Sequence, residues 1–350
     1  MRKILFVIEG LYSAAGIERV STNLLNVLTK NGFDVSVILF GTDKTTFFQL
    51  NESVKLYTLG VPFANKYKLR AAIQLADIAK KISPDYVVNV AVPMMQVTVI
   101  SKILGMPGRI ITWEHFNFKV GSRWGRIFRL FSGLISHDTI VLTEQDRCNY
   151  PLFLRNKIIA INNLVPEMEI KSSLTNKIVL SIGRLNYQKG FDMLLDIWKE
   201  VEKEHSDWIL QIIGSGEDKD MLMQKIKLYQ LEHTVQMIPT VSNIQDYYQN
   251  ASIYVMSSRF EGLPTVLIEA KSYNLPIVSF DCPHGPRTII NNGIDGYLIP
   301  TNNCLEMAKK ISLLIEDFSL RKKLGEAGNL DYTKRFSEKS ILFEWSKILK

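Results

Sequence analysis

Short apolar runs alternate with amphipathic stretches along the first half of the chain. The apolar runs are rich in Val and Ile and are bounded by Gly, Pro, Asp or Asn, which is typical of buried strands. Strands are predicted at 3–8, 34–40, 85–92, 109–113 and 139–143. Between the first two, segment 16–30 places Val20, Leu24 and Leu28 on one helical face, and Gly32 follows it. This alternation predicts a parallel sheet with crossover helices.

The second half of the chain repeats the pattern. Strands are predicted at 177–183, 208–214, 234–238, 251–257 and 276–280. Segment 191–204 predicts a helix, because Leu194, Leu195, Trp198 and Val201 share one face. Segment 162–177 is polar, contains proline and follows neither period, which indicates a linker.

We therefore expect an α/β protein with two Rossmann-like, doubly wound domains that face each other across a cleft. The predicted domains are residues 1–165 and 166–335, and residues 336–350 are expected to form a C-terminal helix that packs towards the first domain. Ligands of such sheets bind outside the carboxyl ends of the strands.

Composition narrows the class of protein. The chain has 350 residues, and its three cysteines, Cys148, Cys282 and Cys304, are too scattered for a disulfide framework. No Cys/His spacing resembles a zinc site, so we expect a reducing, cytoplasmic compartment and no metal. The apolar run Ile4–Ile8 ends at Glu9, whereas a secretory signal needs roughly 7–15 apolar residues.

Positive charge is concentrated in the first half. Residues 1–165 contain 20 Lys and Arg against 11 Asp and Glu, a net charge of +9, whereas residues 166–350 contain 22 against 24, a net charge of −2. Such asymmetry indicates an anionic partner of the first half, either nucleic acid or a membrane surface. A surface charge that only keeps the protein soluble is the alternative.

The loop after the first strand of the second half carries two cations. The predicted strand ends at Gly183, the loop offers Arg184 and Lys189, and a helix begins near Gly190. Two cations beside a helix N-terminus suit a diphosphate group. Two ordinary loop charges are the alternative, and no P-loop motif occurs in the chain.

The stretch "RFEGLPTVLIEA" (259–270) contains two glutamates. Glu261 follows a predicted strand, Pro264 suits the first turn of a helix, and Glu269 falls in its second turn. Backbone N–H groups over 262–265 would point outward, and a carboxylate accepts two hydrogen bonds from a vicinal diol. Glu269 as a surface charge is the alternative, although its apolar neighbours count against it.

Four segments together resemble the family 4 glycosyltransferases, which are retaining enzymes of the GT-B fold with a Glu-x7-Glu signature. These segments are "GRLNYQKG" (183–190), "GSGED" (214–218), "FEGLPTVLIEA" (260–270) and "GPRTIINNGIDGYLIP" (285–300). "AAGIERV" (14–20) resembles the family's first Gly-rich loop, with Ala15 and Gly16 in place of Gly-Gly. "TWEHFNF" (112–118) resembles the segment with the amino-domain histidine. The resemblance is to bacterial enzymes that assemble capsule, O-antigen or exopolysaccharide.

The resemblance implies a role for each matching residue. Arg184 and Lys189 would hold the donor diphosphate, Glu269 the ribose, and Glu261 the transferred sugar, while His115 would lie near the reacting sugar. His115, Arg184, Lys189 and Glu261 are the implied catalytic residues. The implied donor-binding residues are Gly16, Arg184, Lys189, Gly214, Glu261, Gly262, Leu263, Pro264, Thr265 and Glu269. Cations would stabilise the leaving diphosphate without a metal or other cofactor.

Segment 116–134 is basic and contains no acidic residue. Trp124, Ile127, Phe128 and Phe131 follow helical spacing, which suits a helix at a membrane interface. A buried helix with a basic outer edge is the alternative. The predicted membrane or acceptor surface consists of Lys119, Arg123, Trp124, Arg126, Phe128 and Arg129.

We predict a retaining hexosyltransferase that is peripheral at the inner face of the plasma membrane. It would move a hexose or N-acetylhexosamine from a nucleoside diphosphate to a polyisoprenoid-linked glycan, and UDP is the nucleoside diphosphate that we expect. The alternatives are a nucleotide-sugar epimerase and a nucleic-acid-binding protein, although the chain lacks the usual nucleic-acid-binding signatures. His137, His205 and His233 are interpreted as structural, and His284 lies in a Pro/Gly loop with a weak case for a role.

Overall fold

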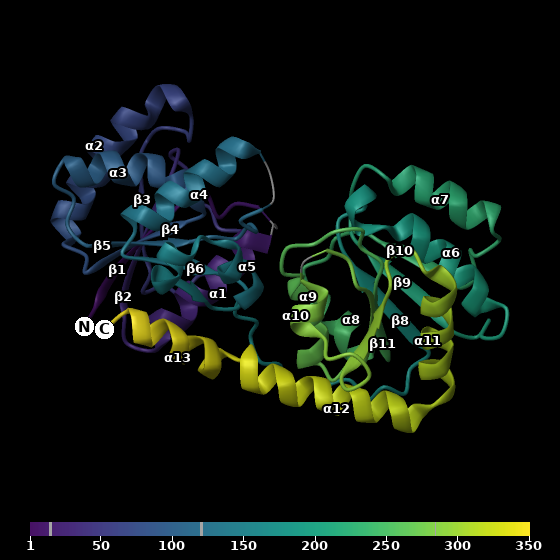
Figure 1. Ribbon diagram of the computed structural model, residues 1–350. Helices are drawn as coiled ribbons and strands as arrows, with labels where there is room; N and C mark the ends of the chain where they lie inside the picture. The colour runs from purple at the N-terminus through teal and green to yellow at the C-terminus, as the bar shows by residue number, and fades with distance from the viewer. Residues whose placement is uncertain (14–15, 120–121, 284) are drawn as a thin grey trace. The chain divides into compact units, whose positions relative to one another are not determined.

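The computed structural model of the chain describes residues 1–13, 16–119, 122–283 and 285–350. The chain divides into two compact units (Figure 1). The first unit comprises Met1–Pro166 together with Glu338–Lys350, and the second comprises Glu167–Ser337. No helix in the described part of the chain is both long enough and apolar enough to span a membrane.

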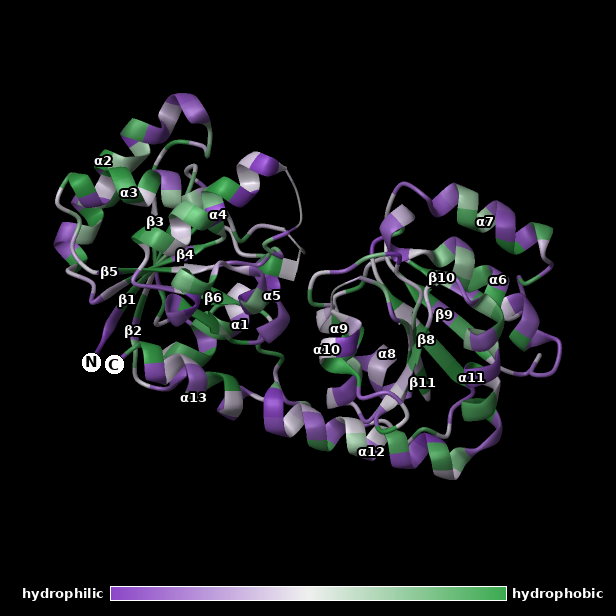
Figure 2. Ribbon diagram, in the orientation of Figure 1, coloured by the Kyte–Doolittle hydropathy of each residue, from purple (hydrophilic) through white to green (hydrophobic). Residues whose placement is uncertain are grey.

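The first unit contains a parallel sheet with the strand order β3-β2-β1-β4-β5-β6-β7. Its strands are β1 (Lys3–Ile8), β2 (Asp34–Leu39), β3 (Lys55–Thr58), β4 (Tyr86–Val90), β5 (Arg109–Trp113), β6 (Asp138–Val141) and β7 (Ile158–Ala160). The central strands are buried because helices cover both faces of the sheet, and Figure 2 shows their hydrophobic character.

Helices surround this sheet. They are α1 (Gly16–Lys30), α2 (Lys68–Ile82), α3 (Met95–Ile103), α4 (Arg123–Ile135), α5 (Glu144–Asn149) and α13 (Glu338–Ile348), with short 3-10 helices η1 (Asn65–Tyr67), η2 (Val92–Met94) and η3 (Leu152–Lys157). The C-terminal helix α13 is part of this unit through Trp345, whose buried ring packs edge-on against Trp113 at 5.5 Å between centroids.

The second unit contains a parallel sheet with the strand order β10-β9-β8-β11-β12-β13. Its strands are β8 (Ile178–Ile182), β9 (Ile209–Ile213), β10 (Val235–Ile238), β11 (Ile253–Met256), β12 (Ile277–Phe280) and β13 (Gly296–Ile299). Its helices are α6 (Phe191–Glu202), α7 (Lys219–Leu228), α8 (Ile244–Asn250), α9 (Thr265–Ser272), α10 (Pro286–Ile289), α11 (Cys304–Glu316) and α12 (Phe318–Arg335), with the 3-10 helix η4 (Tyr187–Lys189).

Both sheets reverse their strand order at one point. In the first sheet the chain runs outward from β1 through β2 to β3 and then continues with β4 on the other side of β1. In the second sheet it runs outward from β8 through β9 to β10 and then continues with β11 on the other side of β8. The loops that follow two such strands diverge and leave room for a ligand at the carboxyl edge. The predicted α/β fold with two parallel sheets is confirmed.

The strands that the sequence did not predict are short. β3 has an exposed first residue and three half-buried ones, β7 has only three residues, and β13 begins with Gly296. None of them has the continuous apolar run that identified the central strands. Residues 162–177, which were predicted to be a linker, contain no helix or strand.

Candidate functional site in the second unit

Two charged residues from different loops meet at the carboxyl edge of the second sheet. Lys189 ends η4 in the loop after β8, and Glu261 lies in the loop after β11. Lys189 Nζ is 2.7 Å from Glu261 Oε1, and the two side chains are 20% and 6% exposed. Because β8 and β11 flank the reversal of strand order, this ion pair lies where a doubly wound sheet binds its ligand.

Backbone and side-chain hydrogen bonds hold the two loops together. Ser257 Oγ donates to the Lys189 carbonyl at 3.1 Å, and the Arg259 N–H donates to the Gln188 carbonyl at 2.8 Å. Gln188 Nε2 donates in turn to the Phe260 carbonyl at 3.1 Å. The position of the Lys189–Glu261 pair is therefore set by several contacts outside the pair itself.

Arg259 is a residue of this site that sequence reasoning missed. Its guanidinium makes two hydrogen bonds to Asp192, of 2.8 and 2.6 Å, and lies 4.1 Å from the ring centroid of Tyr187. Burial raises the pKa of Asp192, but Arg259 outweighs that effect and leaves the pKa below its ordinary value. Arg259 thereby joins the loop after β11 to the first turn of α6. Its position two residues before Glu261 was the only signal for it in the sequence.

Two glycines permit the close approach of these loops. Gly190 has a φ of +65°, and a Cβ at this position would lie 2.2 Å from the Ser257 carbonyl oxygen. A Cβ on Gly214, which follows β9, would lie 1.8 Å from the Gly183 carbonyl oxygen. Any larger residue at either position would push the loops at this edge apart.

Glu269 lies inside α9 and is only 4% exposed, so its interpretation as a surface charge is wrong. Tyr248 from α8 donates its hydroxyl hydrogen to Glu269 Oε2 at 2.9 Å. The Tyr248 ring stacks on Tyr273 at 5.0 Å and on Tyr254 at 5.9 Å between centroids. The buried carboxylate therefore has the partner that its apolar surroundings require.

Tyr254 connects this aromatic stack to the strand that carries the cationic loop. Its hydroxyl lies 3.3 Å from the Ile182 nitrogen and 3.4 Å from the Ile182 oxygen, at the end of β8. Burial first, and then the charges of Glu269 and Glu261, raise the pKa of Tyr254 well above its ordinary value. The phenol is therefore neutral and acts as a hydrogen-bonding strut.

The remaining predicted donor-binding residues lie at three places. Arg184 is an exposed residue just after β8, and it has no ion-pair partner among the residues that the structure describes. Pro264 is the N-cap of α9, one residue before the expected first turn, with Thr265 as the first helical residue; Gly262 and Leu263 precede it. Gly16 is the first residue of α1 in the other unit, and residues 14–15 of the predicted Gly-rich loop lie outside the described residues, as does His284.

The predicted amino-domain residue His115 follows β5 in the first unit. Its ring lies 4.4 Å from that of Trp113, and its Nε2 is buried without a hydrogen-bond partner among the described residues. Burial lowers the pKa of His115 to about 3, so the imidazole is neutral at physiological pH. Such a ring can exchange hydrogen bonds with a sugar hydroxyl but supplies no positive charge.

Glu114 precedes His115 in the chain, and its buried carboxylate contacts a backbone amide and an arginine. Oε1 accepts a hydrogen bond from the Phe116 N–H at 2.9 Å, and Oε2 lies 3.5 Å from Arg129 Nε. Burial raises the pKa of Glu114 to about 7, against the opposing effect of Arg129. This pair fixes the segment after β5 and joins it to α4.

Arg129 is the one member of the predicted membrane surface that lies elsewhere. It is 8% exposed and faces Glu114 inside the unit, because its position on α4 is about opposite that of Trp124. Lys119, Arg123, Trp124, Arg126 and Phe128 are exposed as predicted. The alternative of a buried apolar helix face is wrong, since Trp124 is 70% and Phe128 44% exposed.

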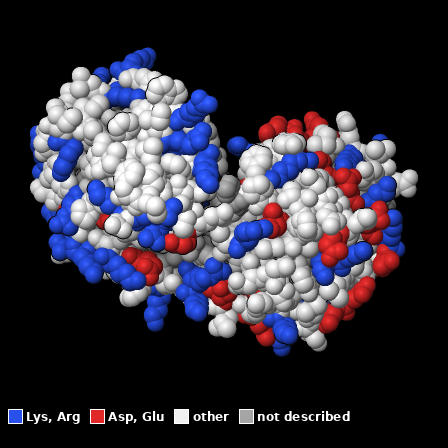
Figure 3. Space-filling view, viewed as in Figure 1, with Lys and Arg blue, Asp and Glu red and all other residues white. Residues whose placement is uncertain are grey.

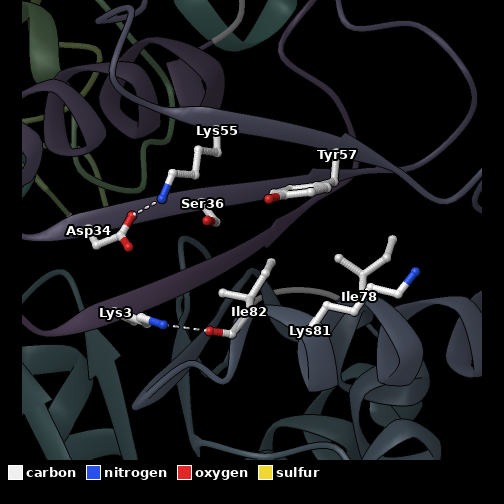
Figure 4. Close-up of a pocket in the computed structure, with 8 residues that line it drawn as sticks. All are labelled: Lys3, Asp34, Ser36, Lys55, Tyr57, Ile78, Lys81 and Ile82. Atoms are coloured by element: carbon white, nitrogen blue, oxygen red, sulfur yellow. Dashed lines mark hydrogen bonds and ion pairs between the residues drawn. The ribbon is translucent and has the colours of Figure 1, made fainter.

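A separate pocket of about 370 Å³ lies at the opposite edge of the first sheet (Figure 4). Lys3, Asp34 and Lys55, the first residues of β1, β2 and β3, line it together with residues of α2. Lys55 Nζ is 2.8 Å from Asp34 Oδ1, and Lys3 Nζ donates to the Ile82 carbonyl. The pocket contains none of the predicted site residues.

One group of side chains in the described residues has metal-ligand types within reach of one another, namely Glu204, His205 and Glu316. Both glutamates are exposed, and His205 Nε2 lies 3.4 Å from Glu316 Oε1. These side chains are distinct from the Lys189–Glu261 site.

Comparison with known proteins places the second unit in a described family. Residues 167–331 match the family described as "Glycosyl transferases group 1". Over the full length of both chains, the protein is 35% identical to an "uncharacterized glycosyltransferase" of Haemophilus influenzae and 32% identical to the "amylovoran biosynthesis glycosyltransferase AmsD" of Erwinia amylovora.

A further relative names its acceptor. The "GalNAc-alpha-(1->4)-GalNAc-alpha-(1->3)-diNAcBac-PP-undecaprenol alpha-1,4-N-acetyl-D-galactosaminyltransferase" of Campylobacter jejuni is 28% identical over all of this chain and 98% of its own length. Among solved structures, the Anabaena protein HepE in complex with UDP and glucose superposes with a TM-score of 0.80, at 17% identity and with 100% of this chain and 99% of HepE covered. Each unit thus has the parallel α/β architecture of the GT-B fold, as predicted.

Proposed function

The chain belongs to the group 1 glycosyltransferases, and on this premise we propose that it is a retaining, family 4-type hexosyltransferase that uses a UDP-sugar. It transfers a hexose or N-acetylhexosamine to a polyisoprenoid-linked glycan during the synthesis of a bacterial surface polysaccharide. The observation that carries the proposal is the Lys189–Glu261 ion pair at the reversal of strand order in the second unit.

The donor diphosphate binds beside the loop after β8. Lys189 and the exposed Arg184 supply two cations next to the N-terminus of α6, which also favours an anion. As the bond between sugar and diphosphate breaks, negative charge builds up on the leaving group. Fixed cations stabilise that charge without reorganising, so we propose that the reaction needs no metal.

The two glutamates divide the sugar recognition between them. Glu269, held by Tyr248, accepts hydrogen bonds from the ribose hydroxyls, and Glu261 accepts them from the transferred sugar beside the amides of Gly262 and Leu263. A carboxylate offers two oxygens to two neighbouring hydroxyls, which is the geometry of a vicinal diol. UDP is our choice of nucleotide because HepE, a structural neighbour, was solved with UDP and glucose.

Two observations support the acceptor assignment. The Campylobacter relative is named for a diphosphate-undecaprenol glycan, and the Erwinia relative for amylovoran biosynthesis. An acceptor on a polyisoprenoid diphosphate resides in a membrane, so we place the enzyme at the inner face of the plasma membrane. From the family resemblance we also propose that His115, which is neutral and follows β5, hydrogen-bonds the reacting sugar.

Retention follows from attack on the face that the diphosphate leaves. The acceptor oxygen forms the new bond to the anomeric carbon, the bond to the diphosphate oxygen breaks, and the leaving phosphate oxygen takes the acceptor proton. Lys189 and Arg184 then neutralise the charge that remains on the nucleoside diphosphate.

The test is to incubate the purified chain with UDP-, GDP- and ADP-sugars and to measure free nucleoside diphosphate, first alone and then with a membrane extract that contains lipid-linked acceptors. We expect one UDP-sugar to respond, and we expect the response to persist with a chelator and to be lost in Glu261→Ala. Complete loss with the chelator would overturn the metal-free reaction. Response to GDP- or ADP-sugars alone would overturn the choice of UDP.

The same assay separates the two alternatives. An epimerase would convert the nucleotide sugar without releasing nucleoside diphosphate or forming a glycosylated product. A nucleic-acid-binding protein would bind arbitrary DNA with strong salt dependence and would ignore nucleotide sugars. Either result would replace the proposed transfer.

A further inference from the structure

The outer face of α4 is apolar and exposed, which is the reverse of an ordinary surface helix. Its exposed large apolar side chains, from 39% to 70% exposed, are Trp124, Ile127, Phe128, Phe131, Leu134 and Ile135. The buried positions of the helix hold Arg129, Ser132 and Gly133 instead. A contiguous apolar face of this kind on a protein surface marks a site of interaction.

The contacts beneath α4 fix this orientation. Arg129 Nε lies 3.5 Å from the buried Glu114 carboxylate, and a Cβ added to Gly133 would lie 3.2 Å from Leu154 Cδ1 of η3. Turning the apolar face inward would break the ion pair and force large side chains into the space at Gly133. The helix is therefore held with its apolar side chains pointing outward.

The 3-10 helix η3 adds to the same region of the first unit. Lys157, its last residue, donates from Nζ to the carbonyls of Leu134 and Ser136 at the end of α4, at 3.4 Å each. Leu152 and Phe153, at its start, are 76% and 74% exposed. Together the exposed apolar residues of α4 and η3 form what we call the docking face.

Positive charge lies beside the docking face. Lys119, Arg123 and Arg126 are exposed and form no ion pair within the described part of the chain, and no acidic residue occurs between Glu114 and Asp138. Figure 3 shows that basic side chains predominate over the first unit, whereas acidic ones gather over the second. Two docking faces brought together would repel each other, which disfavours a second copy as the partner.

We propose that the docking face binds the surface of an anionic lipid bilayer. Aromatic and aliphatic side chains of α4 and η3 enter the boundary between headgroups and acyl chains, while Lys119, Arg123 and Arg126 contact anionic headgroups. The inference rests on the proposed function in one respect, namely that a lipid-linked acceptor requires the enzyme to work at a membrane. To the membrane surface predicted from the sequence it adds Ile127, Phe131, Leu134 and Ile135 of α4 and the exposed start of η3, and it removes Arg129.

Trp124 provides a direct probe of this contact. The chain has five tryptophans, and Trp113, Trp198, Trp208 and Trp345 are all buried, whereas Trp124 is 70% exposed. Transfer of Trp124 into lipid shifts its fluorescence to the blue. We expect this shift with vesicles of phosphatidylcholine and phosphatidylglycerol, and we expect Trp124→Phe to abolish the shift while the protein still sediments with the vesicles.

Sedimentation of variants measures the contribution of each element. We expect the double variant Phe128→Ser/Phe131→Ser to bind the mixed vesicles at least about tenfold more weakly. The matched control is Leu228→Ser/Leu330→Ser, which removes two exposed leucines of the second unit and should bind like the parent. Leu152→Ser/Phe153→Ser should bind about threefold more weakly, and Arg123→Gln/Arg126→Gln should weaken binding at low salt.

Several outcomes would overturn the proposal. The first is that the parent protein does not bind the mixed vesicles. The second is that Phe128→Ser/Phe131→Ser and its control lose vesicle binding equally, and the third is that the Phe128→Ser/Phe131→Ser variant changes only the oligomeric state. Normal binding of Leu152→Ser/Phe153→Ser would remove η3 from the docking face. Shielding of Trp124 by a protein partner in the absence of lipid would also contradict the proposal. Thermal unfolding checks that each variant is folded.

The outcome is separable from that of the proposed function. Release of nucleoside diphosphate from a UDP-sugar needs no vesicle, so a protein that hydrolyses the donor but ignores vesicles is a transferase with a wrongly assigned docking face. A protein that binds vesicles through α4 but never uses a nucleotide sugar retains the docking face and loses the proposed function.

Discussion

The carboxyl edges of the two sheets offer contrasting surroundings on the same topology. In the second unit, the loops after β8 and β11 bring Lys189 and Glu261 into a 2.7 Å ion pair, and Glu269 lies nearby in the chain on α9. In the first unit, the end of β5 carries a neutral His115 and a Glu114 with a pKa of about 7. Strand order provides a binding edge in both units, but the side chains decide what binds there.

Under the proposed function, charge stabilisation belongs to one unit and neutral hydrogen bonding to the other. A leaving diphosphate needs fixed cations, which the second unit supplies. The reacting sugar of the proposed transfer needs hydrogen-bonding groups without strong charge, and the first unit offers the neutral imidazole of His115, whose Nε2 has no hydrogen-bond partner among the described residues. Four predictions test this contrast.

The largest expected effect is at the ion pair of the second unit. Lys189→Ala and Glu261→Ala should each lower the rate of sugar transfer by about a hundredfold to a thousandfold, because each removes a group aimed at the reacting donor. The rate of nucleoside diphosphate release in the presence of acceptor measures this. The control is Lys177→Ala, which removes a lysine from the exposed ion pair with Asp207 in the same unit. Transfer that persists in both variants would show that the pair is structural.

The next effect concerns the buried carboxyl of the first unit. Folding raises the pKa of Glu114 from its ordinary 4.5 to about 7, so that as the pH rises the unfolded chain loses this proton before the folded chain does. The free energy of unfolding should therefore fall through this window, by on the order of 3 kcal/mol at high pH. Glu114→Gln should flatten this part of the pH dependence. Melting temperatures at about pH 5 and about pH 8, followed by tryptophan fluorescence, measure it. An unchanged slope in Glu114→Gln would assign the titration to another group.

A smaller effect is expected where Tyr248 holds Glu269. Tyr248→Phe removes the 2.9 Å hydrogen bond to the carboxylate and should raise the KM for the donor about tenfold, since a hydrogen bond to a charged group contributes about 1.5–3 kcal/mol. It should also reduce the preference for UDP over its 2′-deoxy analogue, which a general loss of stability would not do.

The matched control for Tyr248→Phe is Tyr229→Phe. Tyr229 donates a hydrogen bond of 2.8 Å to Asp196 in the same unit, so this variant loses a similar tyrosine–carboxylate contact. We expect its KM and its ribose preference to equal those of the parent. Equal effects in the two variants would mean that Tyr248 does not position Glu269 for the donor.

The smallest expected effect is on the free energy of unfolding, at the end of β4 in the first unit. Ala91 follows β4 with a φ of 70° and a ψ of 149°, a conformation that suits glycine, whereas glycine occupies the positive-φ position at Gly190 in the second unit. Ala91→Gly should therefore raise the free energy of unfolding by about 1 kcal/mol. Ala64→Gly, at an ordinary φ of −147°, is the control and should not raise it. A lower melting temperature for Ala91→Gly would contradict the strain.

Elements with a strong local pattern were predicted well. The helix expected at 16–30 is α1 with those bounds, and the apolar runs at 3–8 and 109–113 are β1 and β5. Short edge strands such as β3 and β7 were missed, because a strand of three or four half-buried residues lacks a period of its own. Their pairing with a neighbouring strand stabilises them, and that neighbour is distant in the sequence.

The candidate site was predictable in its residues but not in its contacts. Lys189 and Glu261 are 72 residues apart, and only the pairing of β8 with β11 brings their loops together. Arg259 and Tyr248 were missed because an arginine or a tyrosine near a motif is common, and only the fold shows that one bonds Asp192 and the other Glu269. The predicted surface role of Arg129 failed for a similar reason, since its partner Glu114 lies on another element.

The sequence by itself determined the alternation of strands and helices, the concentration of positive charge in the first half, and the motifs that identify a glycosyltransferase. These features depend on periods of two and 3.6 residues and on residue order, which are local properties of the chain. The tertiary structure alone decided which way α4 turns its apolar side, which oppositely charged residues meet, and which carboxyl is buried deeply enough to have a pKa of about 7. Those outcomes depend on distances between segments far apart in the sequence, and packing of the whole domain sets these distances.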